Sequence, residues 1–544
     1  MTQGLNFALN ARINALLCCS AAVLLTACGG NGSDMGASAQ TAATVESSAS
    51  TNATANSTNE PNAADAAAVQ RSASGTDEFA VTGYSGDPLA GNGSINGATA
   101  SNAQPRLLSS VTSVQAASAV TASSARAQVT QLYQTLLNRA PDSTGLAYWT
   151  QVVVGGYPIS GVEAAFRSSA EYADLHGATT PAPGASGGAT VSTPATANNY
   201  YVSPNGSDTA AGTKAAPFKT LARAAKAATK AGTTVWVAPG TYAGGIQTTA
   251  NGTASSRIYW VSTTKWGAKI VPPSSSSNAN AWDNRGNYVS IVGFDVDGSN
   301  AGSGTKWTSG IYTGGSYGMI ADNHVHHVAK NIPCTSGGGS AIGVDSYYHG
   351  VMTDVVSNVV NDIGPTGCTY VQGIYVSTSG TIKNNLVYRV AEAAIHLWHD
   401  AANVIITNNT VTNSGFGIIV GGGDYYYSTA GANNVFVANN LVYANKYGIS
   451  EQGKTGTANQ YRNNLVYQNS TYNISLRNGL KDTGTVSSNP LFAGYSATAA
   501  SPNFHLTSSS PAVGRGIATN AYPVDLDGKP RNASTGYDIG AYQH

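Results

Sequence analysis

The chain has 544 residues, and only 10% of them are charged, with 27 Lys and Arg balancing 27 Asp and Glu. This balance argues against a partner nucleic acid, because a surface that follows phosphates needs a basic excess. The length is enough for several domains. Low charge combined with 62 Gly and 29 Tyr is typical of an exported β protein rather than a cytosolic enzyme.

Residues 1–28 have the pattern of an export signal. An apolar run from Ile13 to Leu25 is too short to span a membrane as a helix, and it leads into the sequence LTACG at 25–29. This resembles the lipobox of bacterial lipoproteins, which implies lipidation of Cys28. The Gly after the cysteine implies the outer membrane of a Gram-negative cell. We expect a periplasmic or cell-surface location, with the lipid on Cys28 as the attachment to the membrane.

Three segments precede the largest domain. Residues 29–125 are rich in Ala, Ser, Thr, Asn and Gly and are predicted to be a disordered tether, since they cannot bury enough apolar surface. Residues 126–177 carry Val129, Leu132, Tyr133 and Leu136 at helical spacing. With the string LNRAPD at 137–142 and YW at 148–149, they resemble a small helical domain of unknown function in bacterial surface proteins. Residues 178–197 are predicted to be a second linker.

A new pattern begins at residue 198. The sequence YYVSPNGSD at 200–208 precedes an Ala-rich helix with Phe218, Leu221, Ala225 and Ala228 on one face, and TVWVAPGTY follows at 234–242. This arrangement resembles the start of right-handed parallel β-helix proteins of the pectate-lyase-like superfamily. In that superfamily such a helix caps the open end of the solenoid.

Internal repeats support the same fold. Gly-Ile or Ala-Ile recurs at 310, 341, 373, 394, 417 and 448, and Asn-x-Val begins at 323, 358, 385, 409, 440 and 464. The asparagine spacings of 35, 27, 24, 31 and 24 indicate one coil of 24 residues that carries loops. Stacked asparagines are expected to bond one another, and alternating apolar residues to fill the interior. The predicted fold class is therefore all-β: a right-handed parallel β-helix over 198–490 with an N-terminal capping helix, a C-terminal cap over 491–544, a separate all-α domain and disordered linkers.

Two cysteines, Cys334 and Cys368, remain outside the signal region. In this registration both fall in loops that precede neighbouring Gly/Ala-Ile strands. Stacked loops bring such positions within disulfide range, and an exported protein meets an oxidising compartment. We predict that the two cysteines are bonded.

Candidate site residues follow from the alternation of inward and outward side chains. The column beside the Gly/Ala-Ile block carries aromatic, acidic and histidine side chains, and a parallel column carries charged residues and histidines. Six of the nine histidines fall between 324 and 399, which is the strongest site signal. We expect a polysaccharide to be bound by Tyr312, Asp345, Trp398, Tyr425 and His327.

A lyase reaction suits these residue types. It requires a group that neutralises the uronate carboxylate, a base for the adjacent proton, and an acid for the leaving oxygen. Arg389, or Ca²⁺ held by Asp345 and Asp362, is assigned the first role. His396 is the predicted base, and Tyr375 or His399 the acid. No other cofactor is expected.

We therefore predict a monomeric outer-membrane lipoprotein that binds a uronic-acid-containing polysaccharide and cleaves it by β-elimination. Two alternatives remain open. One is a glycoside hydrolase or an epimerase acting on exopolysaccharide, with Asp345, Asp362, Asp424 and Glu451 as candidate carboxylates. The other is a non-catalytic glycan-binding or matrix protein at the cell surface.

Overall fold

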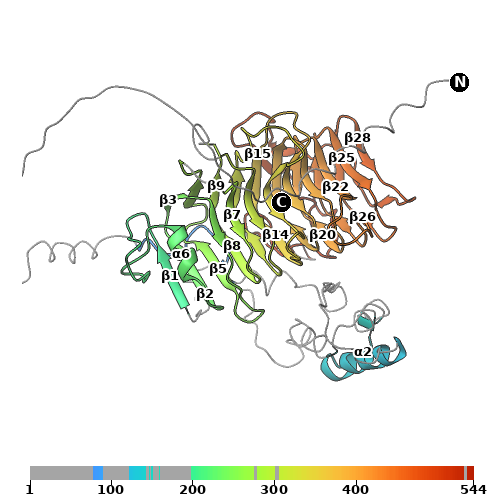
Figure 1. Ribbon diagram of the computed structural model, residues 1–544. Coiled ribbons are helices and arrows are strands. Elements are labelled where there is room, and N and C mark those ends of the chain that lie inside the picture. Colours follow the sequence, from blue (N-terminus) through green and yellow to red (C-terminus); the bar gives the residue numbers. More distant parts are fainter. Residues whose placement is uncertain are drawn as a thin grey trace, which may run out of the picture. The chain divides into compact units, whose positions relative to one another are not determined.

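A computed structural model describes residues 77–89, 122–141, 146, 149, 150, 159 and 198–544, the last range without 275–277, 300–305, 532, 533 and 535. Cys28 and the linker 178–197 lie outside these residues. Parallel strands are stacked along one axis into three sheets, and the chain contributes one strand to each sheet in every coil (Figure 1). The prediction of a parallel β-helix is confirmed.

Sheet I carries the Gly/Ala-Ile blocks. Its strands, in stacking order, are β4 (Ile246–Thr248), β7 (Asn280–Asn284), β10 (Ser309–Thr313), β13 (Gly339–Val344), β16 (Val371–Val376), β19 (Ala393–Leu397), β22 (Phe416–Gly422), β25 (Tyr447–Gly453) and β28 (Tyr472–Ser475).

Sheet II is the longest of the three. Its strands are β1 (Asn198–Val202), β2 (Thr233–Val237), β5 (Ile258–Ser262), β8 (Val289–Val292), β11 (Met319–Ala321), β14 (Thr353–Val356), β17 (Gly380–Lys383), β20 (Val404–Thr407), β23 (Phe436–Ala438), β26 (Gln460–Arg462) and β29 (Asp482–Thr483).

Sheet III carries the Asn-x-Val blocks. Its strands are β3 (Gly240–Ala243), β6 (Ala268–Val271), β9 (Asp295–Asp297), β12 (His324–His326), β15 (Val359–Ile363), β18 (Leu386–Val390), β21 (Thr410–Thr412), β24 (Leu441–Tyr443) and β27 (Leu465–Tyr467).

Two-residue turns join sheet II to sheet III, and the Asn-Asn pairs explain them. The first residue adopts a left-handed conformation, as in Asn384 with φ 58° and Asn408 with φ 57°, and Asn tolerates this better than most residues. The second asparagine is buried and donates its side-chain N–H to the next one, 2.9 Å from Asn385 to Asn409. This ladder runs through Asn323, Asn358, Asn385, Asn409, Asn440 and Asn464.

The interior is filled by stacked aliphatic residues from all three sheets. In sheet I this stack is fully buried and consists of Ile311, Ile342, Ile374, Ile395, Ile418 and Ile449. One coil cannot bury its own apolar face, so each layer depends on its neighbours. Because these side chains point inward, the residues between them face outward along each strand.

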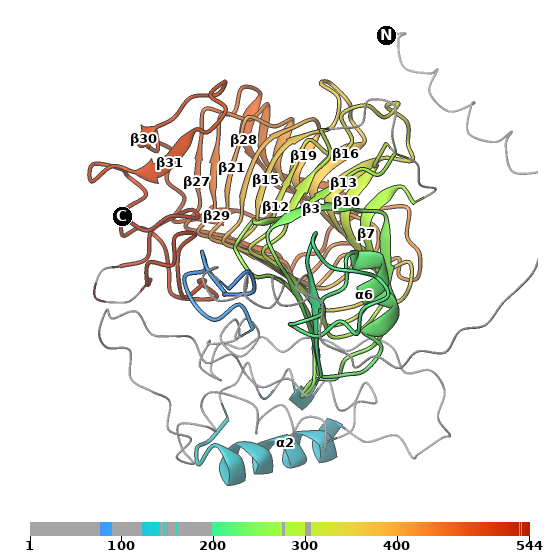
Figure 2. The ribbon, with the colours of Figure 1, turned by 90° about the vertical axis from the view of Figure 1, so that its left-hand side faces the viewer.

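The amino-terminal end carries the predicted helix, α6 (Leu221–Ala227), seen in front of the sheets in Figure 2. Thr220 caps it by accepting a hydrogen bond from the backbone N–H of Arg223 at 3.1 Å. Phe218, Leu221 and Ala228 are buried in the same core cluster as the first strands. The helix therefore covers apolar side chains that lack a preceding coil.

The separate helical region is represented by α2 (Ala122–Leu136). Val129, Tyr133 and Leu136 are buried on one face and pack with Leu137 and Leu146. The prediction of an amphipathic helix with Tyr133 in its core is confirmed.

Residues 77–89 differ from the expectation of a disordered tether over 29–125. Thr82 pairs with Thr264, and the Tyr84 hydroxyl donates to the carbonyl of Ser262 at 2.6 Å. Phe79 and Leu89 are buried among outward-facing apolar residues of sheet II. The segment is ordered because Phe79 and Leu89 pack on an apolar surface that sheet II presents outward.

The carboxy-terminal segment contains the antiparallel pair β30 (Phe492–Gly494) and β31 (Asn503–Leu506). It contacts successive coils: the backbone N–H of Ala541 bonds Thr410, that of Gly540 bonds Asn439, and Asn463 bonds the carbonyl of Arg515. These contacts lie along the flank of the solenoid, which differs from the prediction of a cap that closes its end.

Cys334 and Cys368 form a disulfide, with Cα atoms 5.5 Å apart. They lie in the loops before β13 and β16, which are neighbours in sheet I. The predicted pairing is confirmed.

Candidate functional site

The outward face of sheet I brings together several of the predicted residues. Tyr375 on β16 pairs in register with His396 on β19, and their rings meet edge to face at 5.3 Å. His396 also lies 5.6 Å from the Trp398 ring, and Tyr375 lies 5.9 Å from the His399 ring. These four side chains form one group, which we call the sheet I cluster.

His396 stands out in this cluster because its ring nitrogens have no partner among the described residues. Its ring is partly exposed, but both nitrogens are buried and have no hydrogen-bond partner among the described residues. Burial, with the nearby His399, lowers the pKa of His396 to about 3. The ring is therefore neutral at ordinary pH, but a group with so low a pKa is a weak base. This observation argues against the predicted role of His396.

His399 lies just beyond β19 and is held by two contacts. Its Nδ1 is 2.6 Å from the carbonyl oxygen of Asp424, which can only accept, so Nδ1 carries the proton. Its Nε2 lies 3.0 Å from the Tyr426 hydroxyl, and the two rings stack at 4.2 Å. In neutral His399 the lone pair on Nε2 thus accepts the hydroxyl proton of Tyr426.

Tyr375 of the cluster and the neighbouring Tyr426 both keep their protons. Burial, followed by the charges of Asp345 and Asp400, raises the pKa of Tyr426 to about 12. Burial raises the pKa of Tyr375 further above its usual value. Tyr375 is therefore protonated at ordinary pH, so its hydroxyl carries a proton that it can share with a bound oxygen.

Trp398 lies over a glycine-lined surface. A Cβ atom added at Gly421, Gly423 or Gly453 would come within 2.7, 2.6 or 2.9 Å of its ring. Its Nε1 donates to Asp424 at 3.3 Å. Glycines at the ends of β22 and β25, with Gly423 just after β22, therefore leave room for the indole on the outward face.

Two carboxylates organise the loops around the cluster. Asp345 accepts hydrogen bonds from Tyr312 and Ser377, each at 2.7 Å. Asp400 accepts from the backbone N–H groups of the 426–428 loop and from the Ser346 hydroxyl. These bonds hold both carboxylates in place, and Asp345 fixes the Tyr312 hydroxyl. The predicted role of Tyr312 and Asp345 in binding substrate stays a prediction.

Exposed aromatic side chains border the cluster. Tyr347, Tyr348, Tyr426 and Tyr427 are between 37% and 56% exposed. Tyr347 meets Tyr426 at 5.5 Å, and Tyr427 stacks on His349 at 4.2 Å. Tyr425, predicted to bind substrate, instead has a buried hydroxyl with no partner among the described residues.

Three predicted residues lie elsewhere. His327 follows β12, and Asp362 and Arg389 are the next-to-last residues of β15 and β18. At these equivalent positions of sheet III the backbone is left-handed, with φ of 55°, 57° and 56°. Arg389 binds Asp362 through two hydrogen bonds of 2.8 and 2.7 Å. These residues therefore do not join the sheet I cluster, because the left-handed backbone turns their side chains away from it.

The predicted metal pair is also not formed. Asp345 follows a strand of sheet I and is bonded to Tyr312 and Ser377, whereas Asp362 belongs to sheet III and is bonded to Arg389. Neither occurs in the histidine and aspartate groups of the described residues that could hold a metal ion. One such group, Asp295, His324 and His326, lies on sheet III.

Two residues gain a role that the sequence analysis did not give them. Arg285 pairs with Asp283 at 2.7 Å and lies between the rings of Tyr312 and Tyr348, at 4.7 and 3.6 Å. Tyr426 supplies the hydroxyl that bonds His399. Arg285 stands two residues after Asp283 in the same outward register, so its place on this face could be read from the sequence. The contact of Tyr426 with His399 depends on the path of a loop, which the sequence pattern does not reveal.

Comparisons with known proteins give no established function. Residues 108–176 match the family described as "Domain of unknown function (DUF4214)", and residues 204–249 match "Protein of unknown function (DUF1565)". The chain is 31% identical over 318 residues to the uncharacterized protein YwoF of Bacillus subtilis (strain 168). This similarity covers 51% of the chain and 63% of YwoF, so the chain spans less than two thirds of that relative.

The solved structures similar to this chain include two lyases and an epimerase, by their titles. Pectate lyase Pel9A is 16% identical, with a TM-score of 0.46 over 64% of this chain and 97% of that one. The A-module of Azotobacter vinelandii mannuronan C-5 epimerase AlgE6 is 15% identical, with a TM-score of 0.35 over 49% and 68%. An alginate lyase from Paenibacillus sp. is 18% identical, with a TM-score of 0.31 over 45% and 84%. At these identities the likeness concerns the fold.

Among the described residues, neither helix has the length and apolar character required to cross a membrane.

Proposed function

We propose that the protein is a lyase that cleaves a uronic-acid-containing polysaccharide by β-elimination on the outward face of sheet I. The observation that carries the proposal is the hydrogen bond of 3.0 Å between the Tyr426 hydroxyl and Nε2 of His399, beside Tyr375. A hydroxyl whose proton has an acceptor in place can itself take a proton from carbon.

In the proposed reaction, the Tyr426 oxygen takes the proton from the carbon next to the uronate carboxylate while its own proton passes to His399 Nε2. The carbon–hydrogen and glycosidic carbon–oxygen bonds break, and a carbon–carbon double bond forms between the two ring carbons. The Tyr375 hydroxyl, which holds its proton at ordinary pH, protonates the leaving oxygen, and the resulting tyrosinate is reprotonated from solvent after the product leaves. His396 stays neutral and packs against Tyr375, which makes it a positioning residue.

The substrate is proposed to lie across the strands of sheet I. Exposed Tyr347 and Tyr348 and the indole of Trp398 offer flat surfaces for sugar rings. Arg285 is a cation on this face beside Tyr312, three strands from Tyr375. At ~4.8 Å per strand this is ~14 Å, so Arg285 suits the carboxylate of a neighbouring sugar rather than that of the reacting one.

Calcium, the cofactor predicted from sequence, has no fitting set of ligands in this cluster. Asp345 and Asp400 already accept several hydrogen bonds, and Asp362 is paired with Arg389 on another sheet. No step is therefore assigned to Ca²⁺. Comparing rates with and without added Ca²⁺ tests whether the ion acts on the reacting carboxylate.

The experiment uses the full chain with alginate, polygalacturonate and bacterial exopolysaccharides, and follows the ultraviolet absorbance of unsaturated uronate. We expect activity on one of them, and a loss of ~10²-fold or more in His399→Ala and in Tyr426→Phe. Tyr467→Phe on sheet III is the matched control and should retain activity. Absence of absorbance on every glycan would contradict the proposal. New reducing ends would then favour a hydrolase, and binding without cleavage a glycan-binding protein.

We also propose that the protein is a monomer anchored in the outer membrane by a lipid on Cys28. The lipobox-like sequence LTACG at 25–29 supports this proposal. Fractionation of cells producing the wild type and Cys28→Ser tests it. We expect the wild type in the outer-membrane fraction and the variant in soluble fractions, and equal distribution would contradict the anchor.

A further inference from the structure

A second group of polar residues lies on the outward face of sheet III and takes no part in the proposed lyase site. The sequence Asp-Val-Asp at 295–297 forms β9, and His-Val-His at 324–326 forms β12. The two strands pair in register, with His324 opposite Asp295 and His326 opposite Asp297. The valines point into the core, so two carboxylates and two imidazoles stand side by side outside.

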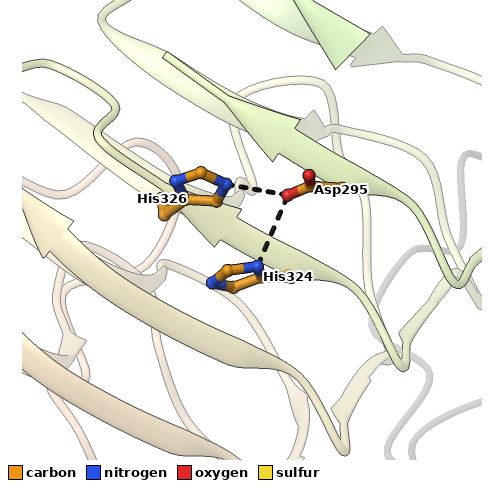
Figure 3. A group of neighbouring side chains, drawn as sticks. All are labelled: Asp295, His324 and His326. Carbon is orange, nitrogen blue, oxygen red and sulfur yellow. Dashed lines mark hydrogen bonds and ion pairs between the residues drawn. The ribbon is translucent and has the colours of Figure 1, made fainter. Parts of the chain in front are cut away.

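Three of these side chains converge on one point. Oδ1 of Asp295 lies 2.8 Å from Nε2 of His326 and 3.4 Å from Nδ1 of His324 (Figure 3). Ligand atoms bound to one tetrahedral Zn²⁺ at ~2.1 Å lie ~3.4 Å apart. The three atoms thus need little movement to share one ion.

The second polar atom of each of these three side chains bonds a further residue. Nε2 of His324 bonds Asn361 at 2.8 Å, and Nδ1 of His326 bonds His327 at 2.6 Å. Lys269 bonds the second oxygen of Asp295 at 3.0 Å. Outer partners of this kind fix the ring orientation and tautomer of metal-binding histidines.

The partner of His324 also determines which of its nitrogens carries a lone pair. Asn361 donates its N–H₂ group to Asp362 at 2.7 Å, so its carbonyl oxygen faces His324. Nε2 of His324 must therefore donate, which leaves a lone pair on Nδ1 of the neutral ring. That lone pair faces a carboxylate oxygen, an arrangement that a bound cation stabilises.

We propose that Asp295, His324 and His326 bind one divalent transition-metal ion of the Zn²⁺ type. Two imidazoles and one carboxylate suit such an ion, whereas Ca²⁺ prefers oxygen ligands alone. Three protein ligands leave a coordination position for water or a glycan oxygen. The His324 side chain is 25% exposed, so this position is reached from solvent.

Proton positions remain balanced when the ion binds. Before binding, Nε2 of His326 donates to Asp295, and Nδ1 of His327 donates to Nδ1 of His326. On binding, Nε2 of His326 loses its proton and becomes a ligand of the ion. The neutral ring then carries its proton on Nδ1. His327 then accepts at Nδ1 and carries its own proton on Nε2. The pair changes tautomers without net gain or loss of protons.

The test measures metal binding by the full chain without a polyhistidine tag, using Co²⁺ for its visible absorption and Zn²⁺ as competitor. We expect one Co²⁺ per chain, displaced by Zn²⁺ but not by an equal concentration of Ca²⁺. Removal of a ligand in His324→Ala or His326→Ala should lower the affinity by at least ~100-fold.

The matched control is His505→Ala, because His505 pairs with Asp527 at 2.6 Å on the surface but belongs to no group of three metal-ligand side chains among the described residues. This variant should bind Co²⁺ as the wild type does. Asn361→Ala keeps every ligand and should weaken binding ~10- to 100-fold, which distinguishes the site from a folding defect. Less than stoichiometric binding by the wild type, or unchanged binding by His324→Ala, would overturn the proposal.

Discussion

The asparagine ladder gives the sharpest stability prediction, for the variant Asn385→Ala. The Asn385 amide donates to the carbonyls of Val355 and Lys383 and to Asn409, at 2.9, 3.0 and 2.9 Å. Its oxygen accepts from both the backbone and the side chain of Asn358, at 2.9 and 3.0 Å. Truncation to Ala therefore removes five hydrogen bonds from a fully buried turn.

The magnitude follows from these bonds. The buried backbone N–H of Asn358 loses its partner, at a cost of ~1–3 kcal/mol, and each of the other four bonds contributes ~0.5–1.5 kcal/mol. We expect the free energy of unfolding to fall by at least ~3 kcal/mol. Urea unfolding followed by tryptophan fluorescence measures the change. The control is Asn205→Ala, an exposed asparagine whose side chain makes no hydrogen bond to the described residues. A loss below ~1 kcal/mol for Asn385→Ala would refute the view that the ladder stabilises the turns.

Three further predictions concern the site and its supports. Because the pKa of His396 is about 3 in the fold and ~6.5 when unfolded, the unfolded chain binds the extra proton between these values, so stability should fall as pH falls from 6.5 towards 3. This loss, up to ~1.4 kcal/mol per pH unit, should be smaller in His396→Gln when denaturation is compared at pH 7, 5.5 and 4.5. Replacing both Cys334 and Cys368 by Ala should lower the free energy of unfolding by up to ~4 kcal/mol, given their separation of 34 residues, and an unchanged urea midpoint would contradict this. Gly423→Ala should displace the Trp398 ring and weaken glycan retention in affinity electrophoresis as much as Trp398→Ala does, whereas wild-type retention would argue against Trp398 as a sugar platform.

Much of the fold was predictable because its signals are local and repeated. The Gly/Ala-Ile and Asn-x-Val blocks mark two of the three strands in each coil, and their spacing sets the stacking. The same registration placed Cys334 and Cys368 in neighbouring loops, which is why the disulfide was predicted correctly. Periodicity also placed Tyr375 and His396 side by side on one face.

The rest of the candidate site could not be predicted from the periodicity of the sequence alone. Asp362 and Arg389 have left-handed backbones as the next-to-last residues of their strands in sheet III, so regular alternation along the strand no longer tells where their side chains point. Tyr426 reaches His399 from a long loop held by Asp400, and no repeat describes that loop. The low pKa of His396 depends on burial by neighbouring side chains, which its position in the sequence does not reveal.

The central claim is that cleavage on sheet I proceeds by elimination through Tyr426 and His399. The most direct measurement is mass spectrometry of the oligosaccharides released from a uronic-acid polysaccharide by the wild type and by Tyr426→Phe. The proposed mechanism predicts products with an unsaturated end, each lighter by one water than a hydrolysis product, and their loss in the variant. Saturated products, or unsaturated products formed equally well by Tyr426→Phe, would contradict it.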